Sequence, residues 1–244
     1  MAIFGCHART MFSDMAKLFE TIKTKVNQGV EWLKAKAKSI SETIQGWVDR
    51  YKKYRESLKR HQEYIDAILD GGLEYNPEDV DIQLREKLKQ VVGRLEDGEL
   101  AEHIKSLSFE ERKVYFEKIL LPMIASEMGV APTFIGWFQD ENTIGFYSET
   151  HQGIALNELY LASDNEYVIN FMINTVIHEC KHAMQWDAVS GRNSHGYSEQ
   201  LISIWKRNFE DYIEPRESDE GYVKQPVEWD ASSFAESVFP TDKK

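Results

Sequence analysis

The spacing of apolar residues predicts that the first sixty residues form one long helix or a helical hairpin. Apolar side chains recur there at alternating steps of three and four residues, the spacing of one helix face and of a heptad repeat. The members of this repeat are Phe12, Met15, Phe19, Ile22, Val26, Val30, Leu33, Ala37, Ile40, Ile44, Trp47, Tyr51, Tyr54 and Leu58. Ser39-Ile40-Ser41-Glu42 has the form of a capping box, at which a second helix could begin.

A break in this pattern marks a domain boundary. Gly71-Gly72 is followed by Tyr75-Asn76-Pro77, and glycine and proline are the residues that most often interrupt regular structure. We therefore divide the chain into a helical region, residues 1–72, and a second domain, residues 73–244.

The second domain has the pattern of an α+β fold. Segments rich in β-branched and aromatic residues predict strands over residues 133–138, 143–148 and 153–157. Helices are expected over residues 77–93, 99–105, 108–129, 163–190, 199–213 and from 226 onward, with an acidic loop at 214–221. Capping boxes at Ser108-Phe109-Glu110-Glu111 and Ser163-Asp164-Asn165-Glu166 should open two of these helices. We expect the three strands to form a small antiparallel sheet.

The helix expected over residues 163–190 carries an H-E-x-x-H motif, His178-Glu179-Cys180-Lys181-His182. Histidines four residues apart lie one turn above each other on a helix, so both imidazoles can bind the same metal ion. Glu179 would then lie beside the open coordination position, where it can take a proton from water. The motif therefore predicts a catalytic Zn²⁺ site with His178 and His182 as ligands and Glu179 as general base.

A catalytic zinc site of this kind needs a third protein ligand, which we expect on the helix that follows Pro226. Glu228 and Asp230 are the candidates. We prefer Glu228, because small residues one turn later, Ala231 and Ser232, would let this helix pack closely on the motif helix.

In these residues the chain resembles the zincin metallopeptidases of the gluzincin type, in which H-E-x-x-H is followed on a second helix by a glutamate in an E-x-x-A pattern. The resemblance covers residues 133–239 and implies hydrolysis of peptide bonds, with Glu228 as the third ligand. Ser232 departs from the pattern, since many relatives have Asp or Asn there. The resemblance also implies that the last strand before the motif forms the edge of a cleft, where an extended peptide could bind by strand addition.

Zincin catalysis usually needs a hydrogen-bond donor that stabilises the oxyanion. His195, Tyr197, Tyr212 and Tyr222 lie between the motif and Glu228, and we prefer Tyr222, because it directly precedes the third-ligand helix. Compact domains of this kind resemble the metallopeptidase toxin domains of bacterial effectors, which specialised secretion or injection systems deliver. The implied partner is a protein or peptide substrate.

Charge distinguishes the two parts of the chain. Residues 1–60 carry a net charge of +7 and the remainder −19, within a total of −12. Three roles fit the basic helical region: packing on the acidic domain or self-association, delivery through secretion or injection machinery, and binding to a membrane surface through Lys34, Lys36 and Lys38. The acidic bulk of the chain argues against nucleic-acid binding.

Other sequence features bear on location and on the alternative function. The chain has no apolar run of about eighteen residues, and its start lacks the basic end and apolar stretch of a signal peptide. We therefore expect a protein that is cytoplasmic in the producing cell, or that is secreted or injected without a signal peptide. Its two cysteines, Cys6 and Cys180, supply no disulfide framework. The alternative to a peptidase is a helical interaction protein with a structural or degenerate zinc site, although structural sites normally use four protein ligands.

Overall fold

A computed structural model describes residues 3–69, 77–95 and 99–241. The chain divides into two compact units, Met1–Gln62 and Glu63–Lys244. The boundary predicted at Gly71-Gly72 lies outside the described residues. Within the described residues, no helix combines the length and the apolar character needed to cross a membrane.

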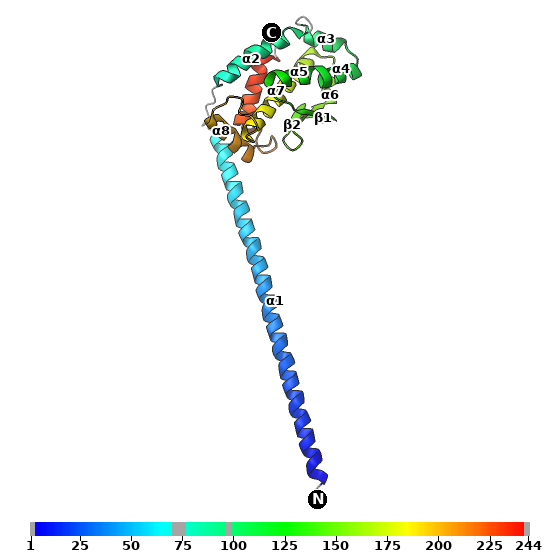
Figure 1. Ribbon diagram of the computed structural model, residues 1–244, viewed down its shortest axis with the longest axis vertical. Helices are drawn as coiled ribbons and strands as arrows, with labels where there is room; N and C mark the ends of the chain where they lie inside the picture. The colour runs from blue at the N-terminus through cyan, green and yellow to red at the C-terminus, as the bar shows by residue number, and fades with distance from the viewer. Residues whose placement is uncertain (1–2, 70–76, 96–98, 242–244) are drawn as a thin grey trace. The chain divides into compact units, whose positions relative to one another are not determined.

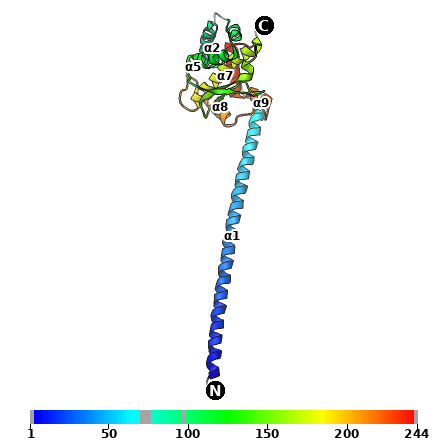
Figure 2. The same ribbon diagram turned by 90° about the vertical axis from the view of Figure 1, so that its right-hand side faces the viewer.

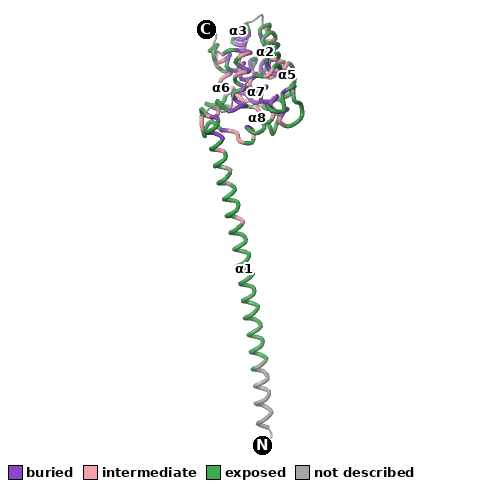
Figure 3. The backbone as a smooth tube through the Cα atoms, turned by 90° about the vertical axis from the view of Figure 1, so that its left-hand side faces the viewer, coloured by how far each residue is buried: buried purple, intermediate pink, exposed green. Residues whose placement is uncertain are grey.

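The described part of the first unit is a single helix, α1 (Ile3–Leu69), whose last turns belong to the second unit. The helix continues through the capping-box sequence at Ser39, so the region is one long helix and not a hairpin. The hydroxyl of Thr43 donates to the carbonyl of Ser39 at 2.9 Å, a bond that follows the helical direction. From Lys17 to Gln45 every residue is exposed, and the tube of α1 is green over most of its described length (Figure 3).

The helices that precede the sheet in the second unit follow the predicted pattern (Figure 1): α2 (Asp79–Val92), α3 (Leu100–Ser106), α4 (Phe109–Tyr115) and α5 (Leu121–Met128). The capping box at Ser108 is confirmed, and Glu111 accepts from the backbone N–H of Ser108 at 2.8 Å. A π-helical turn, η2 (Phe116–Leu120), joins α4 to α5 just before Pro122, which cannot donate a backbone hydrogen bond. Gly129 ends α5 in the left-handed conformation, with φ 70°.

The sheet is mixed, so the expectation of an antiparallel sheet is wrong in part. Its strands are β1 (Thr133–Phe138), β2 (Gly145–Ser148) and β3 (Gly153–Asn157), in the order β1-β3-β2. β2 pairs antiparallel with β3 through a short hairpin, whereas β1 pairs parallel with β3. The central place of β3 agrees with its burial: every residue of this strand is buried, and a buried strand needs partners for its backbone N–H and C=O groups at both edges.

The connection from β1 to β2 must pass the end of β3, and Asn157 at that end holds it. The buried amide of Asn157 donates to the carbonyls of Asp140 at 2.5 Å and Thr143 at 2.6 Å. The Asp140 side chain in turn accepts from the backbone N–H groups of Asn142 and Thr143, each at 2.8 Å. These bonds close a compact turn that leaves β2 free to pair on the far side of β3.

The H-E-x-x-H motif lies on α7 (Glu166–Val189), which follows the short helix α6 (Glu158–Leu161). The predicted helix is confirmed, but its cap is Asn165 and not Ser163: the Asn165 side chain accepts from the backbone N–H of Tyr167 at 2.9 Å. Most of α7 is buried, because it packs against α3, α5, α10 and β2. It is therefore the central helix of the second unit.

Three more helices complete the described chain: α8 (Glu199–Glu210), α9 (Asp219–Lys224) and α10 (Pro226–Val238). Part of the segment predicted as an acidic loop is helical instead. The Ser218 side chain caps α9, and Asp219 and Glu220 lie in its first turn, where negative charge stabilises a helix. In Figure 2, α2 and α5 lie in the upper part of the second unit and α8 and α9 in its lower part.

Candidate metal centre

Two helices bring three metal-ligating side chains together. On α7, His178 and His182 stand one turn apart, with their Nε2 atoms 2.9 Å from each other. On α10, Glu228 lies in the first turn after Pro226, and its carboxylate oxygens are each 3.3 Å from one histidine Nε2. Among the described residues, these three form the one group of His, Cys, Asp and Glu whose geometry could hold a metal ion.

The distances between these donor atoms fit a tetrahedral zinc ion. Zinc bonds of about 2.0–2.2 Å in a tetrahedron place neighbouring ligand atoms about 3.3–3.6 Å apart. The separations from Glu228 to His178 and to His182 match that value, and the shorter separation of the two histidines needs only a small side-chain adjustment. Two imidazoles and one carboxylate also have the chemistry that zinc prefers, and three protein ligands leave a fourth position for water.

Neighbouring polar groups orient both histidines. The Nδ1 atom of His182 lies 2.8 Å from the Gln185 Oε1 atom, so Nδ1–H donates there and Nε2 presents its lone pair to a metal. The Gln185 amide is itself held, because its Nε2 donates to the Val227 carbonyl at 3.1 Å and to Asp230 Oδ2 at 2.8 Å. Ser232, the position that departs from the gluzincin pattern, has its hydroxyl 3.4 Å from His178 Nδ1.

These contacts separate the two candidates for the third ligand. Glu228 faces both histidines, whereas Asp230 is fully buried behind them and contacts Gln185 and Lys181. The geometry therefore favours Glu228 as the ligand and gives Asp230 a supporting position. Gln185 is a residue of this centre that the sequence interpretation missed; its place three residues after His182, on the same helix face, was the available signal.

The electrostatics of the three donors favour a bound cation. Burial alone would raise the pKa of Glu228, but the charges and hydrogen bonds of His182 and His178 lower it well below its usual value. Burial alone would lower the pKa of His182, but the Glu228 carboxylate raises it to about 9. Positive charge is therefore favourable beside the buried carboxylate of Glu228. A metal ion bound at this place would supply that charge.

Glu179 lies beside this group and is almost completely buried. Burial raises its pKa above the usual value, while the charges of His178 and His182 act in the opposite direction. The backbone N–H of Tyr147, on strand β2, hydrogen-bonds its carboxylate. A buried carboxylate with a raised pKa is a better proton acceptor than an exposed one, because its charged form is less stabilised.

Of the four candidate oxyanion donors, the structure brings Tyr212 and Tyr222 to the metal centre. The Tyr212 hydroxyl donates to Glu228 Oε1 at 2.6 Å. Tyr222 lies 6.2 Å from Tyr212 between ring centroids, and the charges of Glu228 and Glu179 act on its phenol. Burial raises the pKa of both phenols, so both remain protonated donors at neutral pH. His195 instead contacts Asp187.

Tyr197, the fourth candidate, belongs to a buried charge cluster that the sequence interpretation did not single out. At its centre is Lys181, whose Nζ lies 2.5 Å from Asp81 Oδ1, 2.6 Å from the Tyr197 hydroxyl and 3.3 Å from Asp230 Oδ2. The rings of Tyr197, Trp205 and Phe234 surround the ammonium group at 4.5–5.3 Å. Because buried charges must be paired, this cluster ties α7 to α2 and α10.

The charge cluster and the metal centre share Asp230. One oxygen of Asp230, Oδ2, lies within contact distance of both Lys181 and the Gln185 amide that orients His182. The cluster therefore supports the metal centre from behind. The sequence did indicate that Lys181 is buried. It follows Ile177 by four residues and precedes Met184 by three, which places it on the apolar face of the helix.

A pocket of about 420 Å³ opens beside the metal ligands. Its lining includes His182, Glu228, Tyr212 and, from strand β2, Phe146 and Tyr147. The strand at the cleft is therefore β2, not β3 as the resemblance implied. The physical reason is the strand order, because β3 is paired on both sides and buried, whereas β2 has a neighbour on one side only among the described strands.

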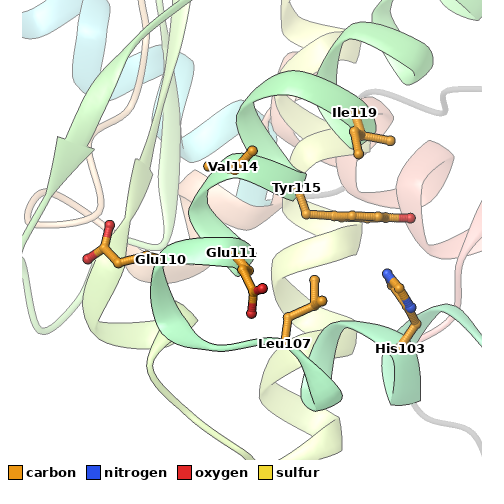
Figure 4. A pocket seen from close by; sticks show the side chains of 7 residues that line it. All are labelled: His103, Leu107, Glu110, Glu111, Val114, Tyr115 and Ile119. Atoms are coloured by element: carbon orange, nitrogen blue, oxygen red, sulfur yellow. The ribbon is translucent and has the colours of Figure 1, made fainter.

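A second, apolar pocket of about 310 Å³ lies between α3 and α4 (Figure 4). Tyr115 and His103 face each other there, with ring centroids 5.2 Å apart, beside Leu107 and Ile119, while the Glu110 carboxylate points away. No metal-ligating group of three is found at this pocket among the described residues.

Comparison of the chain with protein-family models, with curated proteins and with solved structures found no match.

Proposed function

We propose that this protein is a zinc-dependent metallopeptidase of the gluzincin type, which hydrolyses peptide bonds. The observation that carries the proposal is the convergence of His178, His182 and Glu228 next to a buried Glu179 at the wall of an open pocket. A structural zinc site would normally be closed by a fourth protein ligand. This arrangement has three ligands and a carboxylate suited to proton transfer.

His178, His182 and Glu228 would hold the zinc ion through Nε2, Nε2 and the carboxylate. A bound zinc ion supplies Lewis acidity, which lowers the pKa of water and polarises a carbonyl group. The chain's contribution is orientation: Gln185 fixes the His182 ring, and Tyr212 holds one oxygen of Glu228.

Glu179 would act as the general base and then as the general acid. It would take a proton from the attacking water and pass it to the amine that leaves when the peptide bond breaks. Its burial raises its pKa toward the working range, and the Tyr147 N–H bond directs its carboxylate. A neutral amide at this position has no basic oxygen that could accept the proton.

Tyr222 would donate a hydrogen bond to the oxyanion that forms on the substrate carbonyl. Its phenol stays protonated because burial raises its pKa, and it lies where the charges of Glu228 and Glu179 reach it. Tyr212 is the nearest alternative donor; its hydroxyl donates to Glu228 at 2.6 Å, and the Tyr222 phenol likewise interacts with Glu228 and Tyr212.

The substrate would be an extended peptide that pairs with β2. This strand lies at the edge of the sheet and contributes Phe146 and Tyr147 to the pocket beside the metal ligands. Main-chain pairing at such an edge aligns a peptide without demanding a particular sequence, and pocket side chains then select residues.

The decisive experiment replaces Glu179 with glutamine. Glu179→Gln should keep the fold and bound zinc but lower peptide hydrolysis by a factor of at least about a thousand, because general-base catalysis is lost. Circular dichroism, elemental analysis and cleavage of a peptide library would be measured on both proteins, with Glu166→Gln, an exposed acidic residue at the start of the same helix, as the matched control. Unchanged cleavage by the Glu179→Gln protein would exclude the proposed mechanism.

A further inference from the structure

Helix α1 exposes a row of large apolar side chains, here called the apolar stripe. Its members are 43–72% exposed: Met15, Leu18, Phe19, Ile22, Val26, Val30, Leu33, Ile40, Ile44, Trp47, Tyr51 and Leu58. At 3.6 residues per turn they fall within an arc of about 120°, and the stripe is about 66 Å long. Contiguous apolar surface of this extent is rare on soluble proteins and marks a binding surface.

The two edges of the apolar stripe are basic. The following basic residues lie along its two edges: Lys23, Lys25, Lys34, Lys36, Arg50, Lys52, Arg55 and Lys59. The acidic residues fall within an arc of about 40° on the opposite side: Glu20, Glu31, Glu42, Asp49 and Glu56. Four further basic residues, Lys17, Lys38, Lys53 and Arg60, lie on that opposite side as well, so its charge is mixed. Between Met15 and Leu58 the two edges of the apolar stripe carry basic residues and no acidic ones, which fits a negatively charged partner that the apolar stripe enters.

A second copy of α1 fits the apolar stripe poorly. With Val30 at heptad position a, Lys34 and Arg55 occupy e positions, and Lys36 and Arg50 occupy g positions. These positions flank a coiled-coil interface, and a parallel pair would place Arg50 against Arg55 of the second copy. No e or g position between Ile22 and Leu58 carries an acidic residue that could pair with these charges. Bulky aromatic residues also stand among the a and d positions, where two-stranded coiled coils prefer branched aliphatic residues.

We propose that α1 binds the surface of an anionic lipid bilayer and lies in the plane of the interface. The apolar stripe enters the boundary between headgroups and acyl chains, and the edge lysines and arginines reach lipid phosphates while their alkyl stems cover the margin of the stripe. Trp47 and Tyr51, both more than 60% exposed in the stripe, are residue types that favour this boundary. The opposite side, which carries both acidic and basic residues, points to water.

This inference is independent of the metal centre. An acidic partner helix would also satisfy the basic edges, but the aromatic residues of the apolar stripe suit a fluid lipid interface better than the fixed holes of a helical partner. Lipid is therefore the occupant that the residues of α1 favour.

Vesicle co-sedimentation of the full-length protein tests the proposal, with vesicles of phosphatidylcholine alone or mixed with phosphatidylglycerol. The parent should bind the mixed vesicles, and binding should weaken with salt. Lys34→Glu/Lys36→Glu should weaken it by at least about thirtyfold, since each lysine near an anionic surface contributes about fivefold. Lys38, which was expected to bind the membrane together with Lys34 and Lys36, lies by helical pitch on the side opposite the apolar stripe. The matched control, Lys38→Glu/Lys53→Glu, therefore makes the same charge change on the outward side and should lose less than about fivefold.

A second variant tests the apolar stripe itself. Ile40→Ser/Ile44→Ser keeps the charge and changes two exposed side chains, so it should remain helical by circular dichroism and yet bind mixed vesicles much more weakly. Absence of binding by the parent, or equal losses in the two charge variants, would overturn the proposal. Dimerisation of the parent that the serine variant abolishes, or binding to an acidic helical peptide with no binding to vesicles, would assign the stripe to a protein partner and also overturn it.

Discussion

The two units of this protein differ in opposite ways from the usual pattern, in which charged residues are exposed and large apolar residues are buried. The second unit buries charged groups such as Lys181, Asp81 and Asp230, whereas the first exposes large apolar side chains such as Phe19 and Trp47. A buried charge is tolerated only when it is paired, and a large exposed apolar surface is costly unless something covers it. The buried charges have their partners inside the unit, at 2.5–3.3 Å.

This difference in burial indicates which unit carries each of the two proposed activities. In the second unit, buried polar groups converge on the metal ligands, because a low-dielectric surrounding holds them in one geometry and strengthens their interactions. In the first unit, the basic residues beside the exposed apolar stripe fit the anionic lipid surface that we propose as its partner. Chemistry is thus expected in the unit with buried charge, and binding in the unit with exposed apolar surface.

The largest effect is expected from the loss of a metal ligand. The parent should bind about one zinc per chain, and His182→Ala or Glu228→Ala should weaken zinc binding by at least about a thousandfold, because each removes one of three protein ligands. Asp230→Asn should weaken it by only about 10–100-fold, as expected for a group that acts through Gln185. Chelator competition measures all three; zinc retained by Glu228→Ala and lost by Asp230→Asn would make Asp230 the ligand.

The second-largest effect compares a buried lysine of the second unit with an exposed lysine of the first. Lys181→Met should lower the free energy of unfolding by about 3–5 kcal/mol, because it leaves the buried carboxylates of Asp81 and Asp230 without their cation. Lys34→Met, at an exposed position of α1, should change it by less than about 0.5 kcal/mol. Denaturant unfolding followed by tryptophan fluorescence compares the two; equal midpoints for Lys181→Met and the parent would show that the cluster contributes nothing.

The smallest effect concerns the boundary between the units. Ile213 is buried against Tyr64, Ile65 and Ile68 at the end of α1, so these turns belong to the second unit's packing. A fragment of residues 63–244 should keep the stability of the unit, whereas a fragment of residues 73–244, cut at the boundary predicted from sequence, should lose about 2 kcal/mol by exposing Ile213. Thermal unfolding of both fragments measures this difference in stability. Equal stability of the two fragments would support the boundary at residue 72.

Much of the local structure could be predicted from the sequence because its causes are local. The Ser108 capping box, the left-handed Gly129 and the helical spacing of α7 each depend on residues within a few positions of one another. The misplaced cap at Asn165 and the unexpected helix α9 are also local, and show that several polar residues can compete for one capping role.

The sheet and the charge cluster could not be predicted in the same way. The parallel pairing of β1 with β3 depends on which strand is most completely buried, a property of the assembled unit. Lys181 meets Asp81, which lies 100 residues earlier, and nothing in the local pattern of either residue identifies the other. Gln185 likewise gains its role only when α10 supplies Val227 and Asp230.

By itself, the sequence determined the spacing of His178 and His182 and the position of Glu179 between them, because helical pitch places residues four apart on one face. The same pitch determined the apolar stripe of α1 and its basic edges. Only the tertiary structure decided that Glu228, not Asp230, faces the histidines, and that β2 forms the edge of the pocket. The physical reason is that pitch acts over one turn, whereas a site shared by two helices depends on how their buried faces pack.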